Sequence, residues 1–371
     1  MFKVYILKIT NPNNQYLNRL FLEAKWYYNN IIATENIKDF DTKTKEIIVK
    51  CKDGTQRTEH TTHLSSQMRQ QIYKRIWDNI KGLSASKKNG RKIGKLKFTS
   101  KYNCIPMSNQ TIRINKNKIR LQGNKQSFKV RGFEQLPDDY DLRKADLVRK
   151  PSGIYIHLTI KVPNVKIEKT KAVGLDLGIK DHLTFHDGTK INFHQDLTRL
   201  KQLHKSLSRK VKGSKNWNKA KRLLQLEYER LSNQKEDAAN KIINKLKPYT
   251  VYYQDEMING WQAGLFGKAV SKSILGRIKS KLGSSDNLKL DKSKPTTSLC
   301  PNCGCLNKHG LDKRVYSCEC GYTSDRDTHA ANNMIIIGSE RANVEKESDL
   351  CKIFSEIECK HLSMNQEAAM L

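Results

Sequence analysis

The stretch GLDLGIK, residues 174–180, decides how the second half of the chain folds. It continues a short apolar run that begins at Ala172, and it places a carboxylate, Asp176, between two leucines. A charged carboxylate in a buried strand is costly unless an opposite charge compensates it. The pattern therefore predicts a buried strand whose acid has either a cationic side chain or a metal ion as its partner.

The composition points to a polyanionic partner. The chain has 371 residues, enough for two or three domains. It carries 69 Lys and Arg against 37 Asp and Glu, a net charge of +32 with a pI near 9.7. Such an excess favours nucleic acid as the partner. A basic membrane-surface protein is the alternative, but no apolar run approaches the roughly 20 residues of a spanning helix.

The cysteines indicate a reducing compartment. There are nine, an odd number, and five lie between Cys300 and Cys320. This crowding argues against a secreted disulfide framework and favours a metal site. The N-terminal stretch MFKVYILKIT is interrupted by Lys3 and Lys8 and lacks the features of a signal peptide. We therefore predict a cytoplasmic protein.

The first half of the chain has the pattern of a β-barrel-like domain with a helical insertion. A strand over residues 1–10 precedes two amphipathic helices, near 17–31 and 64–82, and short alternating strands continue to about 165. The cationic run 86–101 is predicted to be a loop that enters a strand at Leu96 to Phe98. We assign residues 1–10 and 86–168 to the β-barrel-like domain and 11–85 to the helical module.

In the second half, the dipeptide Asp187-Gly188 predicts a hairpin turn. Residues 199–247 predict a helical hairpin with fifteen Lys and Arg against four Asp and Glu. A solvated helix face is the ordinary reading of a charge run, but here most cations lack an acid at helical spacing, so contact with phosphates is favoured. In the tail, residues 339–371, acids outnumber bases without a sustained apolar period, and we expect it to be mobile.

A second acidic motif is TVYYQDEMINGW, residues 250–261. Its β-prone residues lead to Gln254, Asp255 and Glu256, where open α/β sheets place their sites. Because side chains alternate along a strand, Gln254 and Glu256 point one way and Asp255 the other. Only one of the two acids can face a given site; an ordinary surface strand end is the alternative interpretation.

The third motif, SDRDTHAANNM, residues 324–334, changes from loop to helix. Asp325 is expected to cap the helix, and Asp327 to project from its first turn, near the positive end of the helix dipole. Capping alone would also explain both acids. Acids on two strands and a final helix suit an RNase H-like sheet that binds Mg²⁺, with two ions about 4 Å apart stabilising the attacking and leaving oxygens.

The cysteine pattern predicts a zinc ribbon at residues 296–324. Cys300 and Cys303 have C-x2-C spacing, and Cys318 and Cys320 form a tighter C-x-C pair. Two short-spaced pairs, each followed by glycine, are typical of two knuckles that hold one tetrahedral zinc ion. Cys305 is a spare thiol that could replace a ligand, and buried free cysteines are the alternative interpretation.

These motifs resemble those of the TnpB (OrfB-type) proteins, transposon-encoded RNA-guided DNA nucleases related to type V CRISPR effectors. The matching stretches are VGLDLGIKDHLTF, YYQDEMINGWQ, KPTTSLCPNCG and CGYTSDRDTHAANN, which cover most of residues 171–335 in the family's order. The resemblance implies a wedge domain with an inserted recognition module. It further implies a RuvC nuclease domain, residues 169–295 and 325–338, split by the zinc ribbon. It also implies a guide RNA derived from the transposon end and a double-stranded DNA target with a short flanking motif.

Carried over by this resemblance, the RuvC acids that bind magnesium are Asp176, Glu256 and Asp327. The second motif departs from the family, which often has glutamate followed by Asp-Leu-Asn, because Met257 stands at the aspartate's place. Asp255 therefore stays the alternative acid, and a register two residues earlier would put Gln254 at the glutamate's place.

In the third motif, His329 stands where the family commonly has asparagine, a change expected to alter local hydrogen bonding. Arg326 lies between the two aspartates, where it either assists at the scissile phosphate or pairs with an acid.

Guide pairing carries sequence specificity in such proteins, so the protein needs a cationic channel that holds an A-form heteroduplex by its backbone. We expect the two basic segments and the third acidic motif to supply it. The candidate contacts are Lys87, Lys88, Arg91, Lys92, Lys95, Arg209, Lys210, Lys212, Lys221, Arg222 and Arg326.

The sequence thus predicts an RNA-guided DNA endonuclease with two Mg²⁺ ions and one Zn²⁺ ion, most simply a monomer. Two alternatives stay open. One is a nuclease-inactive RNA-guided DNA-binding protein, which is favoured if Glu256 is not the second catalytic acid. The other is a transposase or transposase accessory factor that acts on transposon ends without RNA.

Overall fold

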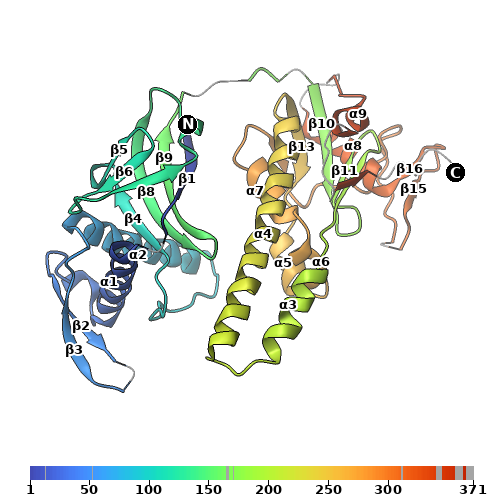
Figure 1. Cartoon of the computed structure of the whole chain (residues 1–371). Coiled ribbons are helices and arrows are strands. Elements are labelled where there is room, and N and C mark those ends of the chain that lie inside the picture. The colour runs from blue at the N-terminus through green and yellow to red at the C-terminus, as the bar shows by residue number, and fades with distance from the viewer. Residues whose placement is uncertain are drawn as a thin grey trace. The chain divides into compact units, whose positions relative to one another are not determined.

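The structure, a computed structural model, describes residues 1–12, 14–51, 53–163, 167–169, 171–310, 312–339, 345–355 and 362–364. The chain divides into two compact units, Met1–Val165 and Lys166–Leu371, which are described separately (Figure 1).

The first unit is built on a curled sheet of seven antiparallel strands in the order β4-β8-β9-β1-β7-β6-β5. Residues of β9 alternate between buried and half-buried, with Ile156 and Leu158 fully buried, which is the pattern of a sheet with one face on a core. The strands are β1 (Phe2–Ile9), β4 (Cys104–Ser108), β5 (Ile112–Asn115), β6 (Lys118–Leu121), β7 (Ser127–Arg131), β8 (Asp141–Lys150) and β9 (Gly153–Lys161).

Between β1 and β4 the chain forms two long helices, α1 (Gln15–Ala33) and α2 (Ser66–Lys88). Each begins at a side-chain cap: Asn14 accepts a hydrogen bond from the Leu17 amide at 3.2 Å, and Ser65 accepts one from the Met68 amide at 3.3 Å. The predicted helices are confirmed. Their apolar faces join the inner face of the sheet in one hydrophobic core, so helices and sheet form a single packed body.

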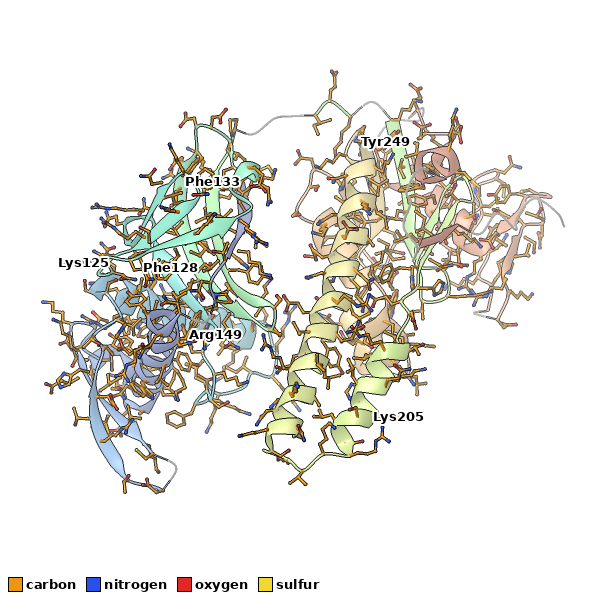
Figure 2. All side chains as sticks on the ribbon, viewed as in Figure 1. Lys125, Phe128, Phe133, Arg149, Lys205 and Tyr249 are labelled. Atoms are coloured by element: carbon orange, nitrogen blue, oxygen red, sulfur yellow. The ribbon has the colours of Figure 1, made fainter. Side chains whose placement is uncertain are left out.

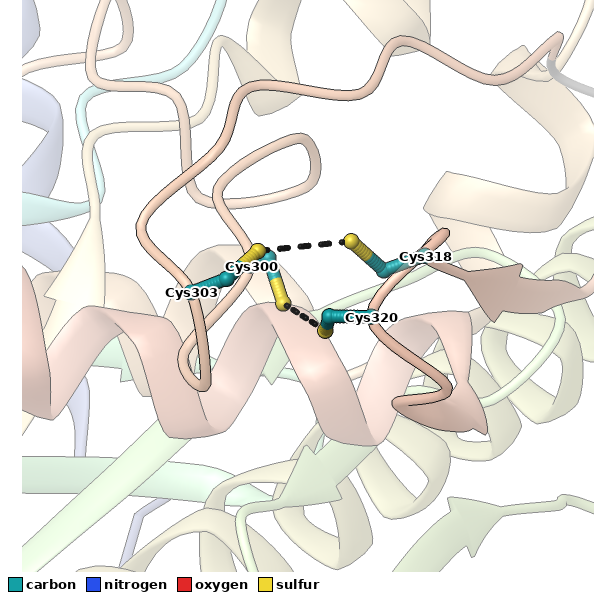
Figure 3. A group of neighbouring side chains, drawn as sticks. All are labelled: Cys300, Cys303, Cys318 and Cys320. Carbon is teal, nitrogen blue, oxygen red and sulfur yellow. Dashed lines mark hydrogen bonds between the residues drawn. The ribbon is translucent and has the colours of Figure 1, made fainter.

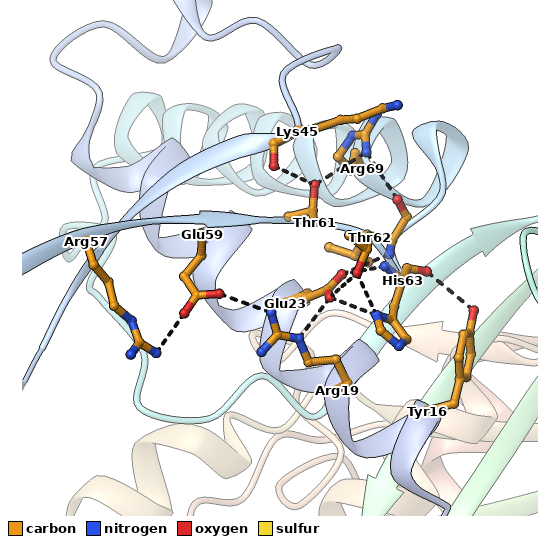
Figure 4. Close-up of polar contacts among 11 residues, drawn as sticks. Tyr16, Arg19, Glu23, Lys45, Arg57, Glu59, Thr61, Thr62, His63 and Arg69 are labelled. Atoms are coloured by element: carbon orange, nitrogen blue, oxygen red, sulfur yellow. Dashed lines mark hydrogen bonds and ion pairs between the residues drawn. The ribbon is translucent and has the colours of Figure 1, made fainter.

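A hairpin of β2 (Glu46–Lys50) and β3 (Gln56–His60), which the sequence analysis did not predict, lies between the helices. The fully buried Glu23 of α1 fastens this region (Figure 4). Its carboxylate accepts hydrogen bonds from the amides of His63 and Leu64, at 2.8 and 3.1 Å, and from Arg19 Nε at 3.0 Å. These donors compensate a charge that would otherwise be costly to bury.

The cationic run 86–101 differs from its prediction. Residues 86–88 end α2, and Leu96–Phe98 form no strand. The segment is instead hydrogen-bonded to α1: Asn29 donates to the Thr99 carbonyl at 3.0 Å and accepts from the Thr99 amide at 2.9 Å. A helix side chain has taken the place of a neighbouring strand as the partner of this backbone.

The second unit contains a mixed sheet in the order β14-β13-β10-β11-β12-β17. The first strand, β10, is central; β11 and β12 follow as antiparallel neighbours on one side, and β13 and β14 lie parallel to β10 on the other. The bounds are β10 (Lys171–Leu177), β11 (Leu183–Phe185), β12 (Lys190–Phe193), β13 (Tyr249–Gln254), β14 (Leu288–Leu290) and β17 (Leu362–Met364).

The sheet is packed on both faces. Val173, Leu175 and Leu177 of β10 share a core with α4 (Lys215–Leu246) and α7 (Leu275–Leu282), whereas Ala172 belongs to a core with α8 (Arg326–Gly338). The remaining elements are α3 (Thr198–Ser208), α5 (Ile258–Ala263), α6 (Gly267–Lys272), β15 (Val315–Ser317), β16 (Thr323–Asp325) and α9 (Leu350–Ser355).

Gly174 marks the closest approach between sheet and helix. A Cβ atom built on it would lie 1.9 Å from the carbonyl oxygen of Ala331 in α8. Only a residue without a side chain lets β10 and α8 come this near. The glycine beside Asp176 is therefore needed to seat α8 over the carboxyl end of β10.

The described residues of the tail, 345–355 and 362–364, include a helix and a strand that the sequence did not predict, and the other tail residues beyond 339 lie outside the described part. In α9, Leu350 and Phe354 are buried in the second unit's core, and Phe354 stacks on Phe185 with ring centroids 5.0 Å apart. Strand β17 also pairs with β12. The helix has only six residues, too few to produce a sustained apolar period in the sequence.

Among the described residues, no helix combines the length and apolar character that crossing a membrane requires.

Candidate functional site

Asp176 lies at the carboxyl end of β10, on the face of the sheet that α8 covers. Side chains alternate along a strand, so Asp176 shares its face with Ala172 and Gly174, which both lie toward α8. On the parallel neighbour β13, Tyr253 is opposite Leu175, so the two strands end side by side. Acidic residues that follow these strand ends are therefore brought to one edge of the sheet.

The electrostatics of Asp176 place the other two predicted acids near it. Burial, as the largest cause, together with the negative charges of Asp327 and Glu256 raises the pKa of Asp176 to about 7. The charge of Arg326 opposes this rise. A carboxylate gains proton affinity when like charges lie close, so the three acids share one site region.

Asp255 and Glu256 follow the end of β13, and the charge of Lys279 on α7 acts on both carboxylates. The Asp255 carboxylate pairs with Lys279 of α7 at 2.7 Å and with Lys289 of β14 at 3.1 Å, and these lysines lower its pKa. Burial raises the pKa of Glu256. Asp255 is thus neutralised on the α7 side, and Glu256 is the acid that acts on Asp176.

Gln254, the third residue of this motif, is held by backbone and side-chain contacts. Its side-chain Nε2 donates to the backbone carbonyls of Asp291 and Lys294, each at 3.1 Å, and its side-chain Oε1 accepts from the Thr296 hydroxyl at 3.0 Å. It fixes the chain that leads from β14 into the cysteine-rich segment. These contacts leave Gln254 with a structural role.

Asp325 caps α8 as the sequence predicted. Its Oδ1 accepts hydrogen bonds from the amides of Asp327 and Thr328, at 3.1 and 3.0 Å. Asp327 lies in the first turn, 3.7 Å from Arg326 Nε and 3.9 Å from Arg314 Nη1. Of the two roles expected for Arg326, pairing with an acid is therefore present in the structure.

His329 connects α8 to the cysteine-rich segment. Its ring stacks on Tyr316 of β15 with centroids 3.8 Å apart, and its Nε2 lies 3.0 Å from the side-chain nitrogen of Asn333. Asn333 also donates to the carbonyls of Thr296 and Leu299, at 2.8 and 2.7 Å. Burial lowers the pKa of His329 to about 4, so the imidazole is neutral in this packed contact.

Four thiols form a compact metal-binding set (Figure 3). The sulfurs of Cys300, Cys303, Cys318 and Cys320 all lie within 4.8 Å of one another, with 3.6 Å between Cys300 and Cys320. A tetrahedral zinc with Zn–S bonds of about 2.3 Å separates its sulfurs by about 3.8 Å. The donor set therefore fits zinc.

The surroundings of the four thiols act in different directions: the pKa values of Cys300 and Cys320 are lowered and those of Cys303 and Cys318 are raised. The backbone amide of Tyr322 and the side chain of Asn302 lower the pKa of the Cys320 thiol to about 6. Asn307 donates to the Cys318 sulfur at 3.1 Å. Cys305 lies outside the four-thiol set, and its carbonyl oxygen accepts the Cys300 amide at 2.8 Å. The spare thiol thus supports a knuckle through its backbone.

Within the described part of the chain, the acids are less tightly gathered than the thiols. The only group of three or more such side chains with ligand atoms all within 4.8 Å is the cysteine set. Two reasons explain this spacing of the acids. Carboxylates repel one another when no cation lies between them. A site with two ions about 4 Å apart also does not require every ligand to bind the same ion.

The predicted nucleic-acid contacts lie on exposed, irregular or helical surface. Lys87 and Lys88 end α2, and the three cations at 91–95 follow in the irregular segment. In the second unit, the three cations at 209–212 lie at the connection between α3 and α4, near the end of α3 that carries Lys205 (Figure 2). Lys221 of α4 lies over the Trp217 ring at 4.6 Å, beside Arg222.

A cationic surface on the first unit was missed. In the hairpin β5–β6, Arg113 lies directly opposite Arg120, and across to β7 Lys118 lies opposite Lys129. These side chains are exposed, whereas Phe128 of β7 is buried (Figure 2). Among the described residues none of the four cations forms an ion pair with an acid. We call Lys8, Arg113, Lys118, Arg120, Lys129 and Arg131 the cationic sheet face.

Like charges directly opposite on a sheet destabilise it unless a counter-charge is present. The same surface borders a cavity of about 730 Å³ that Asn115 and Asn117 also line. The sequence signal was the alternation of cations with isoleucines in RINKNKIRL, residues 113–121, which places the charges on one face.

Two segments of the chain match known families. Residues 155–252 match OrfB_IS605, described as "Probable transposase", and residues 279–334 match "Cas12f1-like, TNB domain". These matches include β10 with Asp176 and the segment from the thiols to Asp327.

Curated relatives match part of the chain. A "Putative RNA-guided DNA endonuclease" of Streptomyces pristinaespiralis is 31% identical over 183 residues, 46% of this chain and 46% of that protein. "TnpB-like protein L79" of Acanthamoeba polyphaga mimivirus is 24% identical over 217 residues, 47% of this chain and 39% of that protein. The chain thus spans less than half the length of these relatives.

Among solved structures, a chain of the "Cas12f1-sgRNA-target DNA complex" is similar at 17% identity with a TM-score of 0.41, over 72% of this chain and 71% of that one. By the two family matches and the curated relatives, part of this chain is similar to TnpB-like proteins.

Proposed function

We propose that the protein is an RNA-guided DNA endonuclease that hydrolyses phosphodiester bonds at one acidic, magnesium-dependent site. The observation that carries this proposal is the grouping of Asp176, Glu256 and Asp327, which come from two parallel strand ends and the first turn of α8. The name of the relative from Streptomyces pristinaespiralis, "Putative RNA-guided DNA endonuclease", supports the same activity.

The strand arrangement of the second unit supports a division into domains. A central first strand with two antiparallel neighbours on one side and two parallel neighbours on the other is the pattern of an RNase H-like sheet. We assign residues 169–295 and 325–338 to a RuvC-type nuclease domain and 296–324 to a zinc ribbon. In the first unit, 1–10 and 86–168 would form the wedge and 11–85 the recognition module, with one shared core.

The carboxylates of Asp176, Glu256 and Asp327 would hold two Mg²⁺ ions, since hard cations prefer oxygen ligands. When bound, such ions polarise the scissile phosphate and lower the pKa of a coordinated water. The chain's own residues prepare the site. The negative charges of Glu256 and Asp327 near Asp176 favour a cation there, and α8 presents Asp327 from its first turn.

For the partners, we propose a guide RNA from the transposon end and a double-stranded DNA target with a short flanking motif. The cationic sheet face and the two basic segments would hold phosphodiester backbones, while base pairing with the guide selects the sequence. A zinc ion held by Cys300, Cys303, Cys318 and Cys320 would fix the segment that leads into α8.

The test is cleavage of a matched DNA duplex by the protein purified with the RNA that accompanies it from its native locus. Asp176→Asn, Glu256→Gln and Asp327→Asn are each expected to lower the cleavage rate about a thousandfold, or about 4 kcal/mol of transition-state stabilisation. Binding of the RNA and the duplex should be unchanged, because each substitution replaces a carboxylate by an amide of the same size.

Asp255→Asn is the matched control, since Asp255 is the adjacent acid that pairs with lysines instead. It should retain cleavage. If Asp255→Asn is inactive and Glu256→Gln is active, the assignment of the second acid is wrong. If the unmodified complex binds the duplex and never cuts it with Mg²⁺, the protein is a nuclease-inactive binder.

A further inference from the structure

We propose that Lys190, on β12, is a positioning residue that holds Asp325, and through it the first turn of α8 with Asp327, against the sheet. This inference rests on the proposed nuclease function and names a residue outside the three acids. Among the described residues, the acids that pair with Lys190 are Asp181 and Asp325, neither of which is one of the three acids of the site.

The sheet register places Lys190 on the correct face. Asp176 of β10 lies opposite Thr184 of β11, and Thr184 lies opposite Lys190 of β12. Residues directly opposite one another project to the same side of a sheet. Asp176 and Lys190 are therefore two strands apart in one row, on the face that α8 covers.

The side chain of Lys190 joins two acids. Its Nζ lies 3.3 Å from Asp325 Oδ2 and 3.6 Å from Asp181 Oδ2. The Lys190 side chain is only 15% exposed and that of Asp181 only 11%, so this is no solvated surface pair. Pairs that are shielded from solvent hold their geometry better than exposed ones.

Asp181 is itself fixed to the β11–β12 hairpin. Its Oδ1 accepts a hydrogen bond from Asn192 Nδ2 at 2.8 Å, and Asn192 Oδ1 accepts the His182 amide at 2.8 Å. Lys190 therefore has a rigid support on the sheet side. The ammonium is held at the sheet and reaches across to α8.

On the helix side, the two oxygens of Asp325 have different partners. Oδ2 faces Lys190, and Oδ1 accepts the amides of Asp327 and Thr328. The carboxylate that receives the lysine is thus the one that caps the helix. A shift of Asp325 would move the backbone amide of Asp327 with it, and small displacements of this kind are costly at reacting centres.

A positive charge is needed at this position. A neutral side chain would leave Asp181 and Asp325 uncompensated beside a region that already holds three acids. Both would then be repelled from the sheet edge where Asp327 must lie. Arginine could reach the same carboxylates, whereas methionine has a similar length and no charge.

The experiment compares Lys190→Met, Lys190→Arg and Asp325→Asn in the full chain with its copurifying RNA. We expect Lys190→Met to lower the turnover rate about tenfold or more, with the KM for the DNA duplex and the zinc content unchanged. Lys190→Arg should recover most of the rate. Asparagine still caps helices, so Asp325→Asn should keep α8 folded and show the same loss as Lys190→Met.

A readout independent of turnover is Mn²⁺ binding to the uncleaved complex, followed by electron paramagnetic resonance. Lys190→Met should weaken it severalfold, because Asp327 is no longer held in place. Lys281→Met is the control, since Lys281 on α7 pairs with Glu236 at 2.6 Å. It should change neither turnover nor Mn²⁺ binding.

The inference is overturned if Lys190→Met turns over and binds Mn²⁺ like the unmodified complex, or if its loss merely equals that of Lys281→Met. It is equally overturned if the loss follows a drop in melting temperature that Lys190→Arg does not repair. Failure of the nuclease function itself is distinguishable, because the unmodified complex would then leave the matched duplex uncut, or Asp176→Asn would cut it equally fast.

Discussion

At the scale of single residues, Asp176 departs most from its surroundings. Its strand neighbours Leu175 and Leu177 are buried as expected for a core strand, yet between them a carboxyl group has a pKa of about 7. Burial is the largest cause, and the charges of Asp327 and Glu256 add to it. At such a carboxyl group, a proton and a metal ion compete for the same oxygen atoms.

The protonation of Asp176 leads to a stability prediction for the metal-free protein. The folded carboxyl titrates near 7 and its ordinary value is 3.8, so over this interval the folded state holds a proton that the unfolded state has lost. Its contribution to stability is therefore present below about pH 4 and is lost as the pH rises through 7.

We expect the melting temperature of Asp176→Asn, relative to the unmodified protein, to be higher at pH 8 than at pH 5, measured by calorimetry in EDTA-free, Mg²⁺-free buffer. The comparison of the two proteins cancels other titrating groups, such as His182 and His329, whose pKa values burial lowers to about 4. A difference that does not vary with pH would contradict the prediction. Saturating Mg²⁺ should reverse the order at pH 8 by stabilising only the unmodified protein.

At the scale of elements, the contact between β10 and α8 leaves no room for an added side-chain atom at Gly174. Gly174 lets the carbonyl of Ala331 approach. The amide of Gly174 also donates a hydrogen bond to Nδ1 of His186, the residue that follows β11, at 3.3 Å. Backbone cannot yield as a flexible side chain can. The helix that carries Asp327 therefore depends on the absence of one methyl group.

Gly174→Ala is expected to destabilise the protein by about 3 kcal/mol, because the added Cβ would overlap the Ala331 carbonyl. In a unit of this size the melting temperature should fall by about 10 °C in a thermal scan. Gly276→Ala is the control: it lies in α7, and a Cβ there meets nothing within 4 Å. The control should melt at or above the original temperature, since alanine favours helix.

The cysteine set predicts which thiols are needed for zinc. Cys318→Ser should lose the single zinc ion measured by plasma emission spectrometry, and its melting temperature should fall by about 10 °C or more. Cys305→Ser should retain the ion, because Cys305 supports the knuckle through its carbonyl oxygen. Zinc lost from Cys305→Ser and retained in Cys318→Ser would show that the ligand set is different.

Local patterns predicted most of the elements and the caps. The alternation in β9, the period of α1 and the cap Asp325 follow from nearest-neighbour geometry, and the structure has them. The remainder depended on partners distant in sequence. Leu96–Phe98 have the composition of a strand, but the segment that contains them is hydrogen-bonded to α1 through Thr99. The ion pair of Lys190 with Asp325 could be recognised only in the structure, where β12 and α8 come together.

At the scale of the whole molecule, charge is distributed unevenly between two compact units. The net charge of +32 exceeds what solubility requires, and both units carry cations without acid partners on their described surfaces. Runs of lysine were visible in the sequence, whereas the cationic sheet face became apparent only when register placed Arg113 against Arg120. Polyanion binding is thus a property of several surfaces.

The cationic sheet face predicts a change in salt dependence. Arg113→Gln with Arg120→Gln should weaken binding about tenfold or more near 0.1 M salt and reduce the slope of log affinity against log salt by about 2. Fluorescence anisotropy across a KCl series, with the copurifying RNA and a DNA duplex in separate arms, would show which backbone the face holds. Arg143→Gln is the control, since Arg143 pairs with Asp141 at 2.5 Å and should leave the slope unchanged.

The order of segments along the chain has a consequence during synthesis. The acids of the site are encoded at 176, 256 and 327, so 151 residues separate the first from the last (327 − 176). A ribosome that adds 5–20 residues per second needs about 8–30 s to cover that distance. During this time β10 has been synthesised and α8 has not, whereas every described strand of the first unit has already been synthesised. A nascent chain can therefore fold its first unit well before the acidic centre exists.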